Sequence, residues 1–211
     1  MNINSNLKHI NHCLINHKVS LMRDKGTGTK EFREYAKEIA LMLGYEALRE
    51  LPTVPTKIVT PLETTTQNLI KKDSVVLLPI LRAGLGMVDG ILTLIPTAAV
   101  GHIGMYRDHQ TFEAKEYFCK MPTLTDKTVL LLDPMLATGG SASAAVKLIK
   151  THKPKKIKFL CIVSVPYGIE QLTKNHSDIE IYTACIDREL NADKYIVPGL
   201  GDAGDRLFGT K

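Results

Sequence analysis

An acidic residue followed by small residues ends an apolar run in "LLLDPMLATGGS" at 130–141. Asp133 only accepts hydrogen bonds when ionised, which suits sugar hydroxyls. Gly139 and Gly140 permit positive φ and a close approach of the backbone, and the amides that open a following helix attract phosphate. The stretch predicts a site for a phosphorylated sugar. The alternative is an ordinary tight turn between a strand and a helix. The pattern G-x-x-x-x-G-K-[ST] of a Walker A loop does not occur.

Two arginines stand at the ends of apolar runs. Arg82, in "LPILRAGLGM" at 78–87, is followed by small residues. A guanidinium in that position can bind a diphosphate through two parallel hydrogen bonds. Arg107, in "GMYRD", is a second cation of this kind. The alternative for Arg82 is a residue that caps a helix beside a turn.

The segment "GLGDAG" at 199–204 matches the dinucleotide pattern G-x-G-x-x-G, but only seven residues follow it. A dinucleotide site needs a strand–helix–strand unit, for which there is no room. We interpret the segment as a loop that exposes backbone N–H and C=O groups to a ligand. The alternative for Asp202, in its middle, is a turn aspartate that bonds its own backbone.

The composition favours a small-molecule ligand over nucleic acid. The chain has 211 residues, 44% of them hydrophobic, and a net charge of +5. That charge suits a phosphorylated small molecule as well as nucleic acid. Aromatic residues make up only 6% and Trp is absent, so no base-stacking platform is visible. The basic stretch "KPKKIK" at 153–158 is interpreted as a solvated turn. We therefore expect no nucleic-acid partner.

The four cysteines are scattered and form no C-x-x-C pair. This argues against a disulfide framework or a zinc site and favours a reducing compartment. The N-terminus lacks the apolar core of a signal peptide, and no apolar run is long enough to span a bilayer. We expect a cytoplasmic protein with no membrane partner.

Strand-like and helix-like patterns alternate along the chain. Strands are expected at 74–81, 98–103, 128–133, 158–165 and 179–186, and helices at 30–51, 86–94, 140–150 and 168–175. This order predicts an α/β fold, a doubly wound and mainly parallel sheet with helices on both faces. Ligands of such sheets bind outside the carboxyl ends of the strands.

Two further segments lie outside that alternation. Residues 107–122 alternate like a β-hairpin and predict a flap over the site. Residues 1–24 are polar and predict a surface helix or a packing arm, so the first 50 or so residues form an N-terminal helical arm. Thr29 is the expected N-cap of the helix that follows.

Three separated motifs carry a resemblance to a known family. The stretch 130–141 resembles the phosphoribosyl diphosphate (PRPP) motif of type I phosphoribosyltransferases, most of which carry two adjacent acids there. Pro134 replaces the second acid. A proline at this position, together with the motifs at 78–87 and "YIVPGLGDAGDRLFGT" at 195–210, makes the chain resemble the uracil phosphoribosyltransferase family. The resemblance starts at "RDKGTGTKEFRE" (23–34) and implies a single domain over 1–211.

The resemblance assigns roles to named residues. It implies that Arg82, Arg107, Asp133 and Asp202 are catalytic, and that the loop at Arg82, sometimes with a cis non-proline peptide, holds the diphosphate. It implies that the uracil-binding C-terminal loop, about 195–210, uses Ile196, Gly201, Asp202 and Ala203. The residues implied to bind PRPP are Arg82, Arg107, Asp133, Pro134, Met135, Leu136, Ala137, Thr138, Gly139, Gly140, Ser141 and Asp202.

The implied reaction joins uracil to PRPP and gives UMP and diphosphate. Mg²⁺ is the implied cofactor, held mainly through PRPP and water rather than by protein ligands. The family also implies a homo-oligomer and GTP as an effector. Two alternatives are a phosphoribosyltransferase for another nucleobase and an RNA-binding regulator with the same fold.

Overall fold

The computed structural model of the protein describes residues 6–107 and 114–210. The N-terminal arm contains a short strand as well as two helices: β1 (Leu7–His9), α1 (Cys13–Arg23) and α2 (Thr29–Ala47). The prediction of Thr29 as N-cap is wrong by one residue. Phe32 N donates to Gly28 O at 2.9 Å, so the carbonyl of Gly28 closes the first turn and Thr29 is already helical.

A central sheet runs in the order β1-β11-β10-β8-β4-β6-β7. Neighbouring strands are parallel except for β6 and β7, which confirms a mainly parallel sheet. The predicted strand at 98–103 is divided at Gly101, where a Cβ would lie 2.7 Å from Lys120 O. Besides β1, the strands of this sheet are β4 (Val75–Leu81), β5 (Ala99–Val100), β6 (His102–Arg107), β7 (Ala114–Lys120), β8 (Thr128–Leu132), β9 (Met135–Leu136), β10 (Lys156–Ser164) and β11 (Glu180–Ile186).

Helices cover both faces of the sheet, as the alternation predicts. On β8, Leu130 and Leu132 join the core formed with α1, α2 and α3 (Leu85–Leu94), whereas Val129 and Leu131 join the core formed with α4 (Gly140–Thr151) and α5 (Pro166–Asn175). Because side chains alternate along a strand, a strand that is apolar throughout contributes to two cores at once. The doubly wound arrangement is confirmed.

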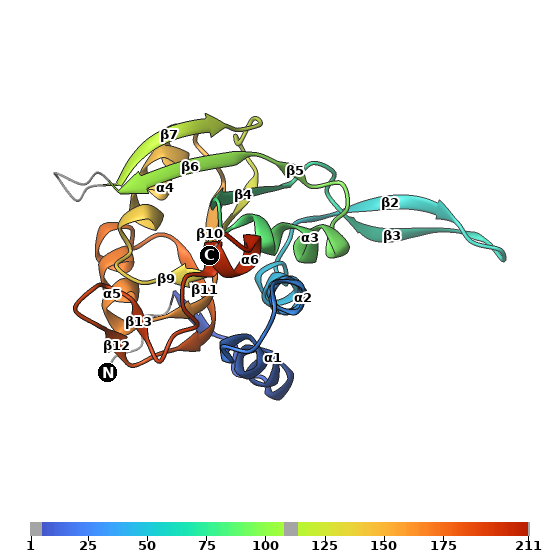
Figure 1. Cartoon of the computed structure of the whole chain (residues 1–211). Coiled ribbons are helices and arrows are strands. Elements are labelled where there is room, and N and C mark those ends of the chain that lie inside the picture. Colours follow the sequence, from blue (N-terminus) through green and yellow to red (C-terminus); the bar gives the residue numbers. More distant parts are fainter. Residues whose placement is uncertain (1–5, 108–113, 211) are drawn as a thin grey trace.

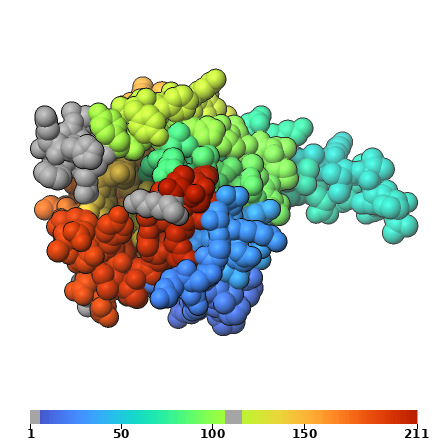
Figure 2. Space-filling view, in the orientation of Figure 1, coloured from blue at the N-terminus to red at the C-terminus, as the bar shows by residue number. Residues whose placement is uncertain are grey.

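Two antiparallel hairpins leave the sheet. β6 and β7 form the predicted hairpin, but it begins at His102, and residues 108–113 of the predicted flap lie outside the described residues. The second hairpin, β2 (Thr53–Val59) and β3 (Thr64–Ile70), extends away from the body (Figures 1 and 2). The sequence did not predict it, because nearly all of its side chains are exposed and no face carries an apolar pattern.

The interpretation of 153–158 as a solvated turn is wrong for Lys158, which is only 3% exposed on β10. Its Nζ donates to Ala47 O at 2.6 Å and lies 3.2 Å from Glu180 Oε2. A lysine buried among apolar strands needs such partners. The ammonium group of Lys158 thus satisfies the carbonyl of Ala47, the last residue of α2. No helix in the described part of the chain is long and apolar enough to cross a membrane.

The contact between α2 and α3 generates a stability prediction. A Cβ on Gly90 would lie 2.1 Å from Lys37 O and 3.0 Å from Leu41 N, so the two backbones touch there. We expect Gly90→Ala to lower the free energy of unfolding by about 1–3 kcal/mol, despite the better helix propensity of alanine. Urea denaturation measures it, with Asp89→Ala, at the exposed neighbouring position, as the control. A variant as stable as the wild type would contradict this packing.

Candidate active site

The carboxyl ends of β4 and β8 bring two of the predicted loops together. Pro79 pairs with Leu132 in the parallel register, so Arg82 and Asp133 follow adjacent strands at one edge of the sheet. The loops meet through their backbones, since a Cβ on Gly84 would lie 2.3 Å from Leu132 O. The predicted arginine loop and acidic loop are therefore neighbours.

The loop after β8 leads directly into α4. Asp133 Oδ1 accepts from Met135 N at 3.3 Å, and Pro134 O accepts from Ile162 N and Val163 N of β10, each at 3.0 Å. Gly139 is the N-cap of α4 and has φ +78°, a left-handed conformation that glycine adopts without a steric penalty. The positive φ that was also expected at Gly140 is not found. We name residues 137–141 the phosphate loop. Its N-cap glycine has no side chain to bond the first amides of α4.

Gly168 of α5 supports the phosphate loop from behind. A Cβ there would lie 2.4 Å from Ala137 O and 2.7 Å from Leu136 O. The sequence patterns did not predict a role for Gly168. Its only local signal is a glycine in the first turn of a helix that begins at Pro166.

Burial raises the pKa of Asp133 to about 7, although the hydrogen bond from Met135 N opposes the shift. Removal of water from the carboxylate disfavours its charged form. Asp133 therefore becomes a full acceptor for sugar hydroxyls only as the pH rises through this value.

Arg82 reaches from the β4 loop to the C-terminal helix α6 (Ala203–Phe208). Its peptide bond with Leu81 is cis, as the resemblance suggested. Its Nη2 lies 3.2 Å from Asp205 Oδ1, and the guanidinium lies 5.8 Å from the ring centroid of Phe208. The side chain is still more than half exposed. It can therefore bind an anion from solvent.

The C-terminal loop (195–210) combines the short strand β13 (Ile196–Val197), which pairs with β12 (Glu189–Leu190), with α6. Gly199 and Gly201 have φ of +62° and +81°. Asp202 Oδ1 accepts from Asp205 N at 2.9 Å, so this carboxylate caps α6. The alternative interpretation of Asp202, an aspartate that bonds the nearby backbone, is therefore correct for this contact. Ala203 follows as the first residue of the helix.

Arg206 holds the C-terminal loop against the N-terminal arm. Its Nη1 donates to Met22 O and Leu200 O, both at 2.8 Å, and its Nη2 donates to Asp24 O at 2.6 Å. The guanidinium lies 4.3 Å from the ring centroid of Phe32, and burial lowers its pKa. No role for Arg206 was predicted from the sequence, because two of its partners, Met22 and Asp24, lie more than 180 positions away.

Arg107 ends β6, at the start of a tip that lies outside the described residues. Arg107 was predicted at the end of a strand, and it is the last residue of β6. Its contact with PRPP stays a prediction. Among the described residues, no group of three or more His, Cys, Asp or Glu side chains could hold a metal ion.

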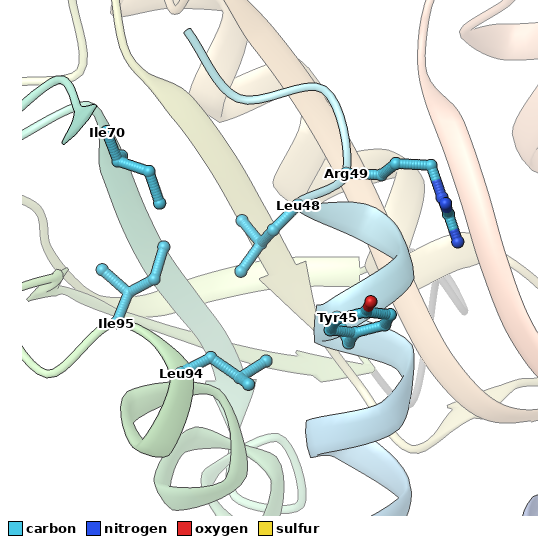
Figure 3. A pocket seen from close by; sticks show the side chains of 6 residues that line it. All are labelled: Tyr45, Leu48, Arg49, Ile70, Leu94 and Ile95. Atoms are coloured by element: carbon cyan, nitrogen blue, oxygen red, sulfur yellow. The ribbon is translucent and has the colours of Figure 1, made fainter. Parts of the chain in front are cut away.

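A pocket of about 360 Å³ lies elsewhere, at the end of α2 (Figure 3). Ile70 precedes β4 and Leu94 ends the helix after it, so this pocket is at the amino end of β4, opposite Arg82. Its lining consists of Tyr45, Leu48, Arg49, Ile70, Leu94 and Ile95.

Comparisons with known proteins agree with this architecture. The purine phosphoribosyltransferase from Pyrococcus horikoshii superposes with a TM-score of 0.52 at 17% identity, covering 74% of this chain and 85% of that one. This likeness concerns the fold alone: the protein has the fold of the type I phosphoribosyltransferases.

Proteins with higher sequence identity to this chain identify its family within this fold. The family model described as uracil phosphoribosyltransferase matches residues 9–210. A uracil phosphoribosyltransferase from Clostridium perfringens is 52% identical over 208 residues, 98% of this chain and 100% of that one. The structure of the AQ2163 protein from Aquifex aeolicus has a TM-score of 0.94 at 36% identity, covering 97% of this chain and 99% of that one. The chain belongs to the uracil phosphoribosyltransferase family.

The phosphate loop generates a binding prediction. Gly140 is exposed, and a Cβ there would meet only Thr138 Oγ1, at 3.7 Å, so Gly140→Val fits the fold but occupies the space before the first amides of α4. We expect the KM for PRPP to rise at least about tenfold, a loss of about 1.4 kcal/mol, with little change in Tm. Lys147→Val, at an exposed position of the same helix, is the control. An unchanged KM would remove the loop from the site.

The raised pKa of Asp133 generates a pH prediction. The folded-state pKa of about 7 lies above the ordinary 3.8, so the folded wild type binds the proton more tightly and loses stability as the pH rises through this range. Asp133→Asn keeps the acceptor for Met135 N but cannot ionise. We expect its Tm to exceed that of the wild type at about pH 8 and to match it at about pH 4.

The same pair of proteins tests the role in binding. We expect kcat/KM for PRPP of the wild type to rise between about pH 6 and about pH 8, and that of Asp133→Asn to be low over the whole range. Changes in the ionisation of PRPP itself affect both proteins equally. Parallel pH profiles for the two would contradict a role for the ionised carboxylate.

Proposed function

We propose that the protein transfers the 5-phosphoribosyl group of PRPP to N1 of uracil and so produces UMP and diphosphate. The observation that carries the proposal is the convergence of three loops at one sheet edge: the phosphate loop after β8, the Arg82 loop after β4, and the C-terminal loop, which Arg82 contacts through Asp205. Membership of the family supports the identity of the two substrates.

Each loop has one task in binding PRPP. The amides at the start of α4 bind the 5-phosphate, because a helix start carries partial positive charge and unpaired N–H groups. Asp133, when ionised, accepts from the ribose hydroxyls. Arg82 binds the diphosphate through its guanidinium, which is more than half exposed, and Arg107 assists from the β6–β7 hairpin.

The C-terminal loop recognises the base through main-chain groups. Uracil presents an acceptor, a donor and an acceptor along O2, N3–H and O4. The amides around Gly201 and Ala203 donate to the two oxygens, and the carbonyl of Ile196 accepts from N3–H. Cytosine reverses the pattern at two of these positions, so it would leave buried groups unpaired, which costs about 1–3 kcal/mol for each group.

The chemical step displaces diphosphate from C1 of the ribose. As the bond to diphosphate lengthens, positive charge builds on the sugar ring, and N1 of uracil loses its proton as it bonds to C1. The protein aligns the two reactants and stabilises the leaving group with guanidinium groups, which supplies several kcal/mol of the barrier. Mg²⁺, bound together with PRPP, would neutralise charge on the leaving group. Asp202 is the carboxylate that would hold the ion through water molecules.

Three further properties belong to this proposal. The protein forms a homo-oligomer, which the projecting β2–β3 hairpin supports, because Leu62 and Val59 at its tip are 95% and 83% exposed. It works in the cytoplasm, consistent with four free cysteines. GTP acts as an effector, a prediction that depends on the family resemblance alone.

An assay with PRPP, Mg²⁺ and a panel of free nucleobases tests the function. We expect UMP from uracil, loss of activity when EDTA removes the metal, and turnover of cytosine lower by up to about 10⁴-fold. A mononucleotide formed only from a purine would assign the protein to another base. Salt-dependent binding of RNA without any turnover would favour the regulator instead.

A further inference from the structure

A buried ion pair lies directly behind the C-terminal loop. Arg23, the last residue of α1, donates from Nη1 to Asp187 Oδ2 at 2.8 Å and from Nη2 to Asp187 Oδ1 at 2.5 Å. Asp187 follows β11, 164 positions later in the chain. The carboxylate is 4% exposed and the guanidinium 21%. Neither residue belongs to the site described above.

Both members of the pair bind the same residue of the C-terminal loop. Gly199 N donates to Asp187 Oδ2 at 2.9 Å, and Gly199 O accepts from Arg23 Nη1 at 2.7 Å. The ion pair therefore satisfies the N–H and the C=O of one glycine. Because both polar groups of Gly199 are fixed, the orientation of the two peptide planes that flank it is fixed as well.

Gly199 lies between the groups proposed to contact the base. A Cβ on Gly199 would lie 2.1 Å from Ile196 O, so the turn at Gly199 packs directly against this carbonyl. Gly201, whose amide is assigned to an oxygen of uracil, is only two residues further on. A rotation of the Gly199 peptides would move the donor and the acceptor relative to each other.

Both groups of the pair carry their charges near neutral pH. Burial by itself raises the pKa of Asp187, but the hydrogen bonds from Arg23 and Gly199 outweigh it, and the pKa lies below its ordinary value. The hydrogen bonds from Arg23 to Asp187 raise the pKa of Arg23. Cys185 Sγ also contacts the pair, at 3.1 Å from Arg23 Nη2.

We propose that Arg23 and Asp187 are positioning residues for base recognition: by fixing both polar groups of Gly199, they set the spacing between the Ile196 carbonyl and the Gly201 amide. The proposal rests on the proposed function, because it assumes that these main-chain groups bind uracil. The pair directs its hydrogen bonds to Gly199 and Cys185, so it acts on the C-terminal loop, and we expect its effect on the binding of the base to exceed that on the binding of PRPP.

Arg23→Lys is the first test. A lysine keeps the positive charge next to Asp187 but has one ammonium group, which cannot reproduce the planar fork that serves Asp187 and Gly199 O together. We expect the KM for uracil to rise at least about tenfold, with the KM for PRPP within about twofold of the wild type. We also expect the ratio of kcat/KM for uracil to that for cytosine to fall.

A matched control removes another ion pair of the same helix. Lys18 of α1 pairs with Glu38 of α2 at 2.8 Å, whereas the side chains that bond Gly199 are those of Arg23 and Asp187, and Glu38→Gln breaks the Lys18 pair. We expect wild-type values of both KM constants and of the uracil-to-cytosine ratio for this variant. Asp187→Glu, which keeps both charges but moves the carboxylate by one methylene relative to Gly199 N, is measured in parallel and should show the same selective rise as Arg23→Lys.

The outcomes separate the proposal from a merely structural role. If the variants only lower Tm, or raise both KM constants equally, the pair stabilises the fold without positioning the loop, and the proposal is wrong. If Arg23→Lys does not fold, the same criterion applies to Asp187→Glu. If the wild type itself does not convert uracil, the proposed function fails; if the wild type does but neither variant changes the KM for uracil, the positioning role alone fails.

Discussion

The anchoring of the C-terminal loop is the constraint on which the site depends. We propose that this loop binds its ligand through main-chain groups, and groups used in that way are not available to hold the loop in place, so other residues must hold it. Arg206 binds carbonyls from the loop and from the N-terminal arm, and Arg23 with Asp187 binds both polar groups of Gly199. Arginine suits this task because its planar fork serves several acceptors at once and always keeps its charge.

The buried ion pair between Arg23 and Asp187 has a desolvation cost, which its hydrogen bonds offset. Burial of an ion pair removes two charges from water, and a pair with poor geometry would destabilise the fold. Asp187 accepts two hydrogen bonds from Arg23 and a third from Gly199, so both of its carboxylate oxygens are hydrogen-bonded. Removal of one partner would leave the other charge buried, which costs about 3–5 kcal/mol in comparable cases. The pair therefore fixes one arrangement of the loop more than it adds net stability.

The other two loops are held by backbone contacts. Gly84 lies against Leu132 O, and Gly168 lies against Ala137 O, at distances that no side chain would allow. The parallel register of β4 and β8 places their carboxyl ends side by side, and the absence of Cβ atoms lets the loops that follow touch. The partial charge at the start of α4 and the positive charge of Arg82 thus lie on neighbouring loops, as a sugar that carries phosphate at both ends requires.

Local patterns in the sequence determined the order of the main strands and helices and the positions of the two loops proposed to bind anions. Apolar runs such as 128–133 and the glycines at 139–140 have short-range physical causes, so one segment at a time reveals them. Only the tertiary structure decided the partners of Arg23, Arg206 and Lys158, because each of them bonds at least one residue more than 100 positions away. It also decided that the exposed residues 53–70 form a hairpin, since a strand pair without a buried face leaves no periodic pattern in the chain.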